Sequence, residues 1–357
     1  MKKITNLMMM ALLSVCMGLT SCDDILGEWS RPAPVMPTVN PDVTPEPAIN
    51  LIATPLTFEV MSATAGNITV NSSTIPSGMQ YSLNGGAKKP VTTTAEAIAV
   101  QPGDKVAFYG NGTTITEYFS TKTQFDSDVD VKVYGNIMSL VDEEGFADNK
   151  NLPANDTFYE IFRNNQKLTD ASGLQLPAMT LKPECYYGMF FNCDALTKAP
   201  EKLPAESLTS NCYQNMFNGC VALTTAPELP AKNLAVNCYD NMFNSCYVLT
   251  TAPELPAETL LANCYQYMFA NCKALTATPK LPATTLVYQC YYHMFDGCTS
   301  LTKAYVKADF TLGNSECTSM FTSCSASGDL YTDGATSGSP SWADASVVSA
   351  WTKHAYE

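Results

Sequence analysis

The stretch from Cys185 to Cys324 decides the fold, because one block of sequence returns in it at a nearly constant distance. Five copies, beginning at positions 185, 212, 238, 264 and 290, read CYYGMFFNCDALTKAPEKLPAESL, CYQNMFNGCVALTTAPELPAKNL, CYDNMFNSCYVLTTAPELPAETL, CYQYMFANCKALTATPKLPATTL and CYYHMFDGCTSLTKAYVKADFTL. The Met-Phe pair recurs at positions 189, 216, 242, 268, 294 and 320, so the period is 27 residues once and 26 thereafter. Such a period predicts a solenoid, in which similar units stack and bury a common core.

Three columns of the block stay apolar in every copy and form the predicted core. They hold Phe, the second Cys and a Leu, and they comprise Phe190, Phe217, Phe243, Phe269, Phe295 and Phe321, then Cys193, Cys220, Cys246, Cys272, Cys298 and Cys324, then Leu196, Leu223, Leu249, Leu275 and Leu301. The segment from Leu to Leu-Pro, such as 223–230, is predicted to be a strand that ends at Pro, which lacks the N–H group of a ladder. The Cys-Tyr-x-x-Met-Phe segment is predicted to be a short helical return, with Tyr and Phe four residues apart on one face.

The motif Phe-x-x-Cys-x-x-Leu, with Pro after a short strand, resembles the BspA-type leucine-rich repeat of bacterial surface proteins. The resemblance implies a leucine-rich-repeat (α/β) solenoid over residues 181–327. It also implies that the chain binds a host matrix protein, another cell or a glycan. A glycan-capture module of a nutrient uptake system is the alternative, and a hydrolase is a further one.

The two ends of the repeat region are predicted to be capped. The sequence FYEIFRNNQKLT at 158–169 is a degenerate repeat within a helix-like capping region, 136–180, and places Thr157 and Asn165 in the two Cys slots. Polar residues in core slots suit the open end of a stack. At the other end, Tyr305 replaces Pro and Lys307 occupies the Leu slot, which predicts an irregular final strand. Residues 328–357 are the predicted C-terminal cap, with Trp342 and Trp351 covering the last core layer.

Residues 51–135 carry short runs of alternating apolar and polar residues, separated by turn signals such as Asn84-Gly85-Gly86 and Pro102-Gly103. Period-two runs with Gly, Asn and Pro between them predict an N-terminal antiparallel β-sandwich. The pattern leaves its strand order open.

The first 50 residues predict export and a lipid anchor. An apolar run from Leu7 to Leu19 follows two lysines and is too short to span a bilayer with its flanks, which is typical of a cleaved signal peptide, residues 1–21. The ending Leu-Thr-Ser-Cys resembles a bacterial lipobox and makes Cys22 the predicted lipidation site. The resemblance of Asp23-Asp24 to the surface signal of lipoproteins in gut Bacteroidetes implies exposure on the outer membrane. A Pro-rich stalk, 22–50, follows.

The formal net charge of −14 disfavours nucleic acid as a partner, because phosphate binding needs clustered Lys and Arg. No arrangement of nucleophile and base stands out, so no catalytic residue, cofactor or metal site is predicted and the chain is interpreted as a non-enzyme. Zinc in particular is disfavoured because the chain has only His293 and His354 to join its cysteines.

Twelve cysteines lie in the repeats, and in an exported chain an even number invites a disulfide interpretation. The two Cys of one repeat are eight residues apart, which is about 12 Å in a helix, whereas a disulfide needs Cα atoms within about 7 Å. Copies in neighbouring repeats would point the same way. Buried free thiols are therefore the prediction.

Two positions of the repeat, the second and third residues after its first Cys, vary while the core positions do not, and these variable positions predict a ligand patch. They contain Tyr187, Tyr267, Tyr292 and His293, which we expect to face solvent. Tyrosine offers a flat apolar ring and a polar tip, suited to sugar faces or protein contacts. The bland interpretation, that these rings only cover neighbouring repeats, stays open. The strand side, with Glu228, Glu254 and Lys280, is the competing surface for a charged partner.

Overall fold

The computed structural model describes residues 49–75, 78–111, 115–117, 121–308, 315–333 and 351–356. These residues form mostly strands and turns, arranged in several sheets, and their only helices are the 3-10 turns η2 (Leu51–Ala53) and η3 (Ile137–Leu140). No helix within these ranges has the length and apolar character to cross a membrane. The predicted signal peptide, Cys22 and nearly all of the predicted stalk lie outside the described residues.

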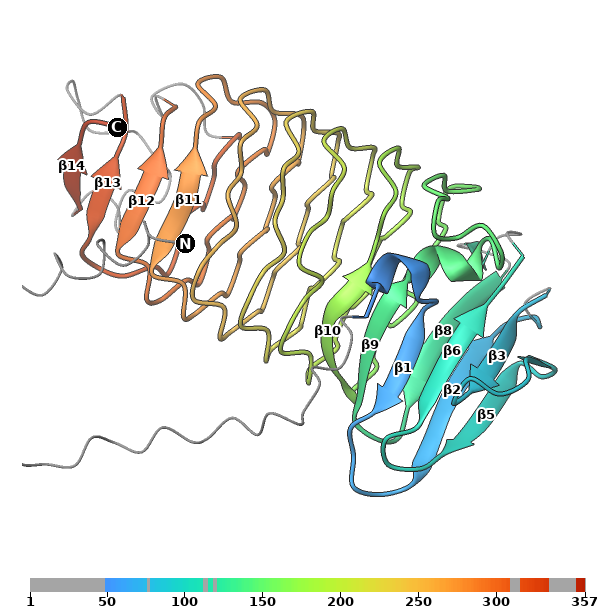
Figure 1. Ribbon diagram of the computed structural model, residues 1–357. Helices are drawn as coiled ribbons and strands as arrows, with labels where there is room; N and C mark the ends of the chain where they lie inside the picture. Colours follow the sequence, from blue (N-terminus) through green and yellow to red (C-terminus); the bar gives the residue numbers. More distant parts are fainter. Residues whose placement is uncertain are drawn as a thin grey trace, which may run out of the picture. The chain divides into compact units, whose positions relative to one another are not determined.

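The N-terminal strands form two sheets (Figure 1). The six-stranded sheet has the order β10-β9-β1-β6-β3-β4 and consists of β1 (Thr57–Val60), β3 (Gln80–Leu83), β4 (Lys89–Pro90), β6 (Lys105–Tyr109), β9 (Val131–Asn136) and β10 (Leu168–Gln175). The four-stranded sheet has the order β5-β2-β8-β7 and consists of β2 (Gly66–Ser72), β5 (Ala95–Val100), β7 (Thr116–Glu117) and β8 (Thr121–Ser127). The pairings within residues 57–136 are antiparallel, as predicted.

Aromatic rings from the two sheets meet in a common core. Phe58 of β1 and Phe108 of β6 lie 5.4 Å and 4.7 Å from Phe125 of β8, measured between ring centroids, and all three residues are fully buried. The predicted antiparallel β-sandwich is found in part: two sheets share this core, but they do not form a closed sandwich, because β10 pairs in parallel with β9 and carries the larger sheet into the repeats. An unpaired edge at β9 would expose a row of backbone N–H and C=O groups, and β10 covers it.

The predicted helical return is wrong as well. In each repeat, residues four apart adopt the left-handed conformation, for example Asn211, Asn215 and Gly219 with φ of 57°, 58° and 79°. A left-handed residue at every fourth position prevents a continuous helix, and Asn and Gly tolerate that conformation best. The result is a ribbon of consecutive turns, so the described repeats contain no α-helix.

The ribbons of adjacent repeats are joined by backbone hydrogen bonds. Every second N–H group donates to the next repeat, as in Tyr213 N to Cys238 O at 3.1 Å and Phe217 N to Met242 O at 2.9 Å. The intervening N–H groups close turns within their own repeat, as in Met216 N to Tyr213 O at 3.2 Å. The backbone N–H groups of the ribbon therefore find all their hydrogen-bond partners only when repeats stack, because one repeat alone leaves half of these donors unpaired.

The predicted core columns are confirmed. Rings of the Phe column stack at centroid distances of 5.2, 5.5, 5.5, 5.5 and 5.7 Å from Phe190 to Phe321. A second column of fully buried rings runs beside it and consists of Tyr186, Tyr213, Tyr239, Tyr265 and Tyr291. The Leu column and the second Cys column are buried as well, down to Cys298, whereas Cys324 is half-buried.

The degenerate repeat is neither helix-like nor an outer end. Phe162 stacks on Phe190 at 5.3 Å and lies 6.0 Å from Phe125 of the four-stranded sheet. Asn165 is fully buried, accepts a hydrogen bond from Ser127 Oγ at 3.2 Å and donates to Phe125 O at 3.3 Å. The polar residue in the Cys slot therefore joins two parts of the core instead of facing water.

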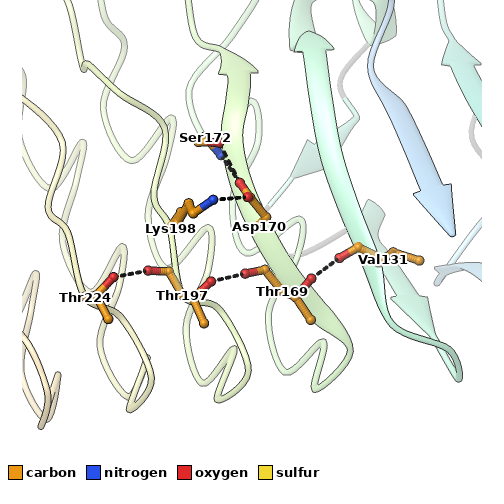
Figure 2. A network of polar contacts seen from close by, with 7 residues as sticks. All are labelled: Val131, Thr169, Asp170, Ser172, Thr197, Lys198 and Thr224. Carbon is orange, nitrogen blue, oxygen red and sulfur yellow. Dashed lines mark hydrogen bonds and ion pairs between the residues drawn. The ribbon is translucent and has the colours of Figure 1, made fainter. Parts of the chain in front are cut away.

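Threonine hydroxyls continue this junction along the repeats (Figure 2). Thr169 Oγ1 donates to Val131 O at 3.0 Å, Thr197 Oγ1 to Thr169 O at 2.8 Å, and Thr224 Oγ1 to Thr197 O at 2.9 Å. Lys198 pairs with Asp170 at 3.0 Å beside this ladder. The sheet edge and the first repeats thus share one polar network.

The last strands are regular except for one register shift, which lies between Ala277 and Lys280 and agrees with the predicted irregularity. They form a parallel sheet of β11 (Ala277–Leu281), β12 (Lys303–Val306), β13 (Asp329–Tyr331) and β14 (Thr352–His354). Tyr305 supplies the N–H group that Pro would lack, and it donates to Thr278 Oγ1 at 2.9 Å. A register shift pairs Leu281 with Val306, so Val306 fills the buried Leu place instead of Lys307.

Trp351 covers the last ring of the Phe column. Its ring lies 6.1 Å from Phe321, its Nε1 donates to Ser325 O at 2.9 Å, and the residue is 3% exposed. Trp342, which was expected to act with it, lies outside the described residues.

Candidate ligand-binding surfaces

Three of the four predicted patch residues form one cluster, here called the ring cluster: Tyr267, Tyr292 and His293. Tyr267 stacks on His293 at 4.8 Å with an interplanar angle of 18°, and Tyr292 stands edge-on to both rings, at 5.5 Å from Tyr267 and 4.3 Å from His293. The two repeats are joined beneath the rings by the hydrogen bond from Tyr267 N to Tyr292 O at 2.9 Å.

The backbone at two of these residues is left-handed. Tyr267 has φ of 51° and His293 has φ of 52°. The equivalent position is Gly188, Asn215 or Asn241 in the other full repeats. The left-handed conformation costs about 1–2 kcal/mol for an ordinary L-residue, and such strain concentrates at functional positions.

The ring cluster is half-buried, so the expectation that these side chains project freely into water is only partly met. The His293 side chain is 20% exposed, and its Nδ1 lies 2.8 Å from an Asp296 carboxylate oxygen. Desolvation, followed by the charge of Tyr292, raises the pKa of Tyr267 above 10.0. The cluster therefore presents partly covered rings and polar edges.

Tyr187 does not join the ring cluster. Its ring stacks on Tyr159 at 4.6 Å with an interplanar angle of 1°, and its hydroxyl accepts a hydrogen bond from Asn215 Nδ2 at 3.0 Å. Two full repeats separate it from Tyr267 along the stack. Tyr187 therefore covers the ring of the neighbouring repeat, as in the alternative interpretation of the patch residues.

Asp240 occupies the same column as Tyr187 and Tyr292 and was not singled out by its sequence context. It is 8% exposed and accepts hydrogen bonds from Gln214 Nε2 at 2.8 Å and Asn241 Nδ2 at 2.6 Å. Burial raises the pKa of its carboxyl to about 6, although both hydrogen bonds act in the opposite direction. Gln214 and Gln266 occupy this column in the neighbouring repeats. An aspartate where both neighbours have glutamine is the sequence feature that could have pointed to Asp240.

Two exposed tyrosines were also missed. Tyr288 is 58% exposed, and Tyr247 is 40% exposed with Lys273 Nζ 4.6 Å above its ring centroid. Tyr247 and Lys273 are 26 residues apart, so the repeat period alone would have placed them on adjacent repeats.

The competing surface is a groove on the strand side of the stack, which we call the TTAPELP groove. Its volume is about 660 Å³, and it is lined by residues 224–230 together with residues 250–254 and 256. Both Glu228 and Glu254 lie on it, and Lys202 pairs with Glu228 at 3.5 Å. Lys280 does not line this groove.

The described residues contain no group of three His, Cys, Asp or Glu side chains suited to holding a metal ion. The repeat cysteines are free thiols, and desolvation raises the pKa of Cys185 to about 12. In the second Cys column the thiols donate to backbone oxygens, as in Cys193 Sγ to Phe162 O at 3.0 Å. Those thiols act as small buried groups that satisfy the backbone.

The chain matches no protein-family model and no curated protein. Among solved structures it is similar to a leucine-rich repeat protein from Bacteroides ovatus ATCC 8483, with a TM-score of 0.29 and 18% sequence identity. The similarity covers 61% of this chain and 58% of the other, so this chain spans less than two thirds of that protein's length. A functional assignment must therefore come from the two surfaces themselves.

Proposed function

We propose that this protein is a binding module that recognises a protein or glycan through the ring cluster. The observation that carries the proposal is the pair of aromatic side chains, Tyr267 and His293, on left-handed backbone positions that Gly or Asn occupies in the other full repeats. Neither ring fills the core, so core packing does not offset the energetic cost of the left-handed backbone at these two positions. A role in recognition accounts for residues that the fold itself disfavours.

The chemistry of the cluster suits binding better than catalysis. Aromatic side chains present large contact areas at a low cost in conformational entropy, and Tyr and His add polar edges that orient a partner. His293 is held by the Asp296 carboxylate and by the rings of Tyr267 and Tyr292, so the contacts of its side chain are those of a packed recognition surface. We therefore place the protein among binding and adhesion modules rather than hydrolases.

In the same proposal the repeats form a BspA-type leucine-rich-repeat solenoid that is closed at its far end by Trp351. Cys22 carries a lipid that anchors the mature chain to the outer membrane, and the solenoid is displayed on the cell surface. The lipobox-like sequence before Cys22 and the two aspartates after it support this arrangement. The partners are a host protein, another cell or a glycan, and no nucleic acid.

The binding proposal is tested with a glycan array and a panel of immobilised matrix proteins. The test variant carries Tyr267→Asn, Tyr292→Gln and His293→Asn, which are residues that other repeats bear in the same columns. Tyr247→Val is the matched control, because it removes an exposed ring outside the cluster and Val221 already occupies its column. We expect the triple variant to lose at least tenfold in affinity while the control binds like the native protein.

Binding that survives the triple substitution would remove the ring cluster from consideration. A native protein that is retained by neither the array nor the matrix panel would count against the binding function itself.

Anchoring is tested separately, by fractionating cells that express Cys22→Ser. The variant should leave the membrane fraction, because the serine hydroxyl cannot be thioether-lipidated, whereas Cys16→Ser within the apolar run should not change fractionation. Protease added to intact cells should remove the native protein. A membrane-bound Cys22→Ser variant, or full protection from protease, would contradict the proposal.

A further inference from the structure

The backbone ladder on the strand side is interrupted at one repeat. Towards the N-terminal side, Thr224 N donates to Thr197 O at 3.1 Å and Glu228 N to Glu201 O at 2.9 Å. Towards the C-terminal side, Thr302 N donates to Thr276 O at 3.0 Å and β11 pairs with β12. Within the described residues, no backbone hydrogen bond joins segment 250–260 to either neighbouring repeat.

The threonine ladder stops at the same repeat. Hydroxyl donation runs from Thr224 back to Val131 (Figure 2) and resumes where Thr302 Oγ1 donates to Thr276 O at 3.5 Å. Thr250, the member between these two runs, makes no such bond to any residue that the structure describes, and its side chain is exposed. The sequence TTAPELP is identical in the paired segment 224–230 and the unpaired segment 250–256, so the interruption is a property of the stack and not of the local sequence.

The unpaired segment lines the TTAPELP groove. The groove floor is apolar, with half-buried Ala226 and Ala252 and the proline rings of Pro227 and Pro253. Pro253 is half-buried, whereas the prolines in its column at 200, 227 and 279 are buried, as expected if the groove opens at this repeat. The residues whose backbone makes no bond to a neighbouring repeat thus line the groove.

The charge of the groove is negative. Glu254 is exposed and has no ion pair or hydrogen bond within the described residues, while the paired Glu228 keeps a side chain that is 74% exposed. A cationic side chain in the groove would complement Glu254, and the net charge of −14 would assist its approach.

We propose that the TTAPELP groove binds an extended segment of another polypeptide. The segment pairs with the backbone C=O groups of residues 250–255 and with their N–H groups other than at Pro253, which has none, and it places a Lys or Arg side chain against Glu254. Unpaired strand-like backbone recognises extended peptides by adding a strand, with side-chain pockets supplying specificity. This site is independent of the ring cluster.

The test uses pools of acetylated and amidated heptapeptides with a fixed central Lys, Arg, Gln or Glu. Peptides retained by the full chain are separated by size exclusion and identified by mass spectrometry. We expect the Lys and Arg pools to be retained at least tenfold more than the Glu pool, with Gln between them. Peptides resynthesised with alternate amides N-methylated should lose binding, because they cannot pair with the backbone of the groove.

Glu254→Gln should weaken binding of the best Lys peptide about tenfold, as expected for removal of a charged hydrogen bond, and 1 M salt should weaken binding to the native protein in the same direction. Glu258→Gln is the matched control, since Glu258 is exposed on the same repeat and does not line the groove. The triple ring-cluster variant should bind the peptide like the native chain, which separates this proposal from the proposed function.

Equal retention of all four pools, or of none, would overturn the proposal. If the N-methylated peptide bound as tightly as the unmodified one, recognition would rest on charge alone, and strand addition would be overturned. Equal losses in Glu254→Gln and Glu258→Gln would show that only the net charge matters.

Discussion

Phe162 stacks on Phe190 with ring centroids 5.3 Å apart and ring planes inclined by 20°. The first ring belongs to the degenerate repeat and the second to the first full repeat, while Phe162 also lies 5.9 Å from Phe58 of the N-terminal sheets. One ring therefore belongs to the core of the sheets and to the core of the repeats, which makes the two cores continuous.

Phe162→Ala should destabilise both parts of the chain together. Removing a fully buried Phe side chain costs about 3–5 kcal/mol, through lost burial and the cavity that remains. Hydrogen exchange in a urea series, followed by mass spectrometry of peptides from residues 57–136 and from residues 185–324, should show both signals moving to lower urea. Phe191→Ala, at a half-buried neighbouring position, should cost about 1 kcal/mol. A loss confined to one of the two signals would contradict the continuous core.

The thiols of the repeats should be hidden until the protein unfolds. Burial raises the pKa of Cys290 to about 11 and of Cys185 to about 12, so hardly any thiolate is present at pH 8. Iodoacetamide should leave the native repeat region unlabelled over minutes, with the half-buried Cys324 reacting first. Denaturation without reductant should then allow twelve repeat cysteines to be alkylated, as determined by intact mass. A mass that shows several residual disulfides would refute the free-thiol structure.

Asp240→Gln should stabilise the protein at neutral pH and not at acidic pH. The folded pKa of about 6 lies above the ordinary 3.8, so the folded state holds this proton more tightly than the unfolded chain does. Stability of the native protein therefore falls as pH rises from about 4 to 6, and the glutamine variant lacks this loss. We expect the variant to gain about 2 kcal/mol at pH 7.5 and nothing at pH 4, measured by urea unfolding.

The exposed Asp194→Asn serves as the control for that pH series and should change stability equally at both pH values. Parallel stability profiles of native protein and Asp240→Gln would show that Asp240 titrates normally.

Backbone strain at Tyr267 should be visible when Asn and Ala are compared at this position. Both substitutions remove the same ring contacts, but Asn adopts the left-handed conformation more readily. Tyr267→Asn should therefore be about 1 kcal/mol more stable than Tyr267→Ala in thermal or urea unfolding. Tyr292, which is not left-handed, gives the control pair and should show no such preference for Asn. An alanine variant as stable as the asparagine variant would mean that the position carries no strain.

The sequence by itself determined the repeat period and the buried columns. Stacking places every copy of a residue beside its own equivalent, so a column of Phe or Leu that never turns polar must lie in the core, and the Phe rings from 190 to 321 do stack this way. The period also brought Tyr267, Tyr292 and His293 together before any geometry was known.

Only the tertiary structure decided how the backbone satisfies its polar groups. Tyr and Phe four residues apart fit a helix, yet the left-handed residues at 211, 215 and 219 direct alternate N–H groups to the next repeat, a partner that no local pattern reveals. The same holds for Asn165, which looks like a residue for an open end and is instead buried against Phe125 and Ser127. Two identical TTAPELP segments, one paired and one unpaired, show that hydrogen bonding between repeats depends on the neighbours in the stack and not on the segment alone.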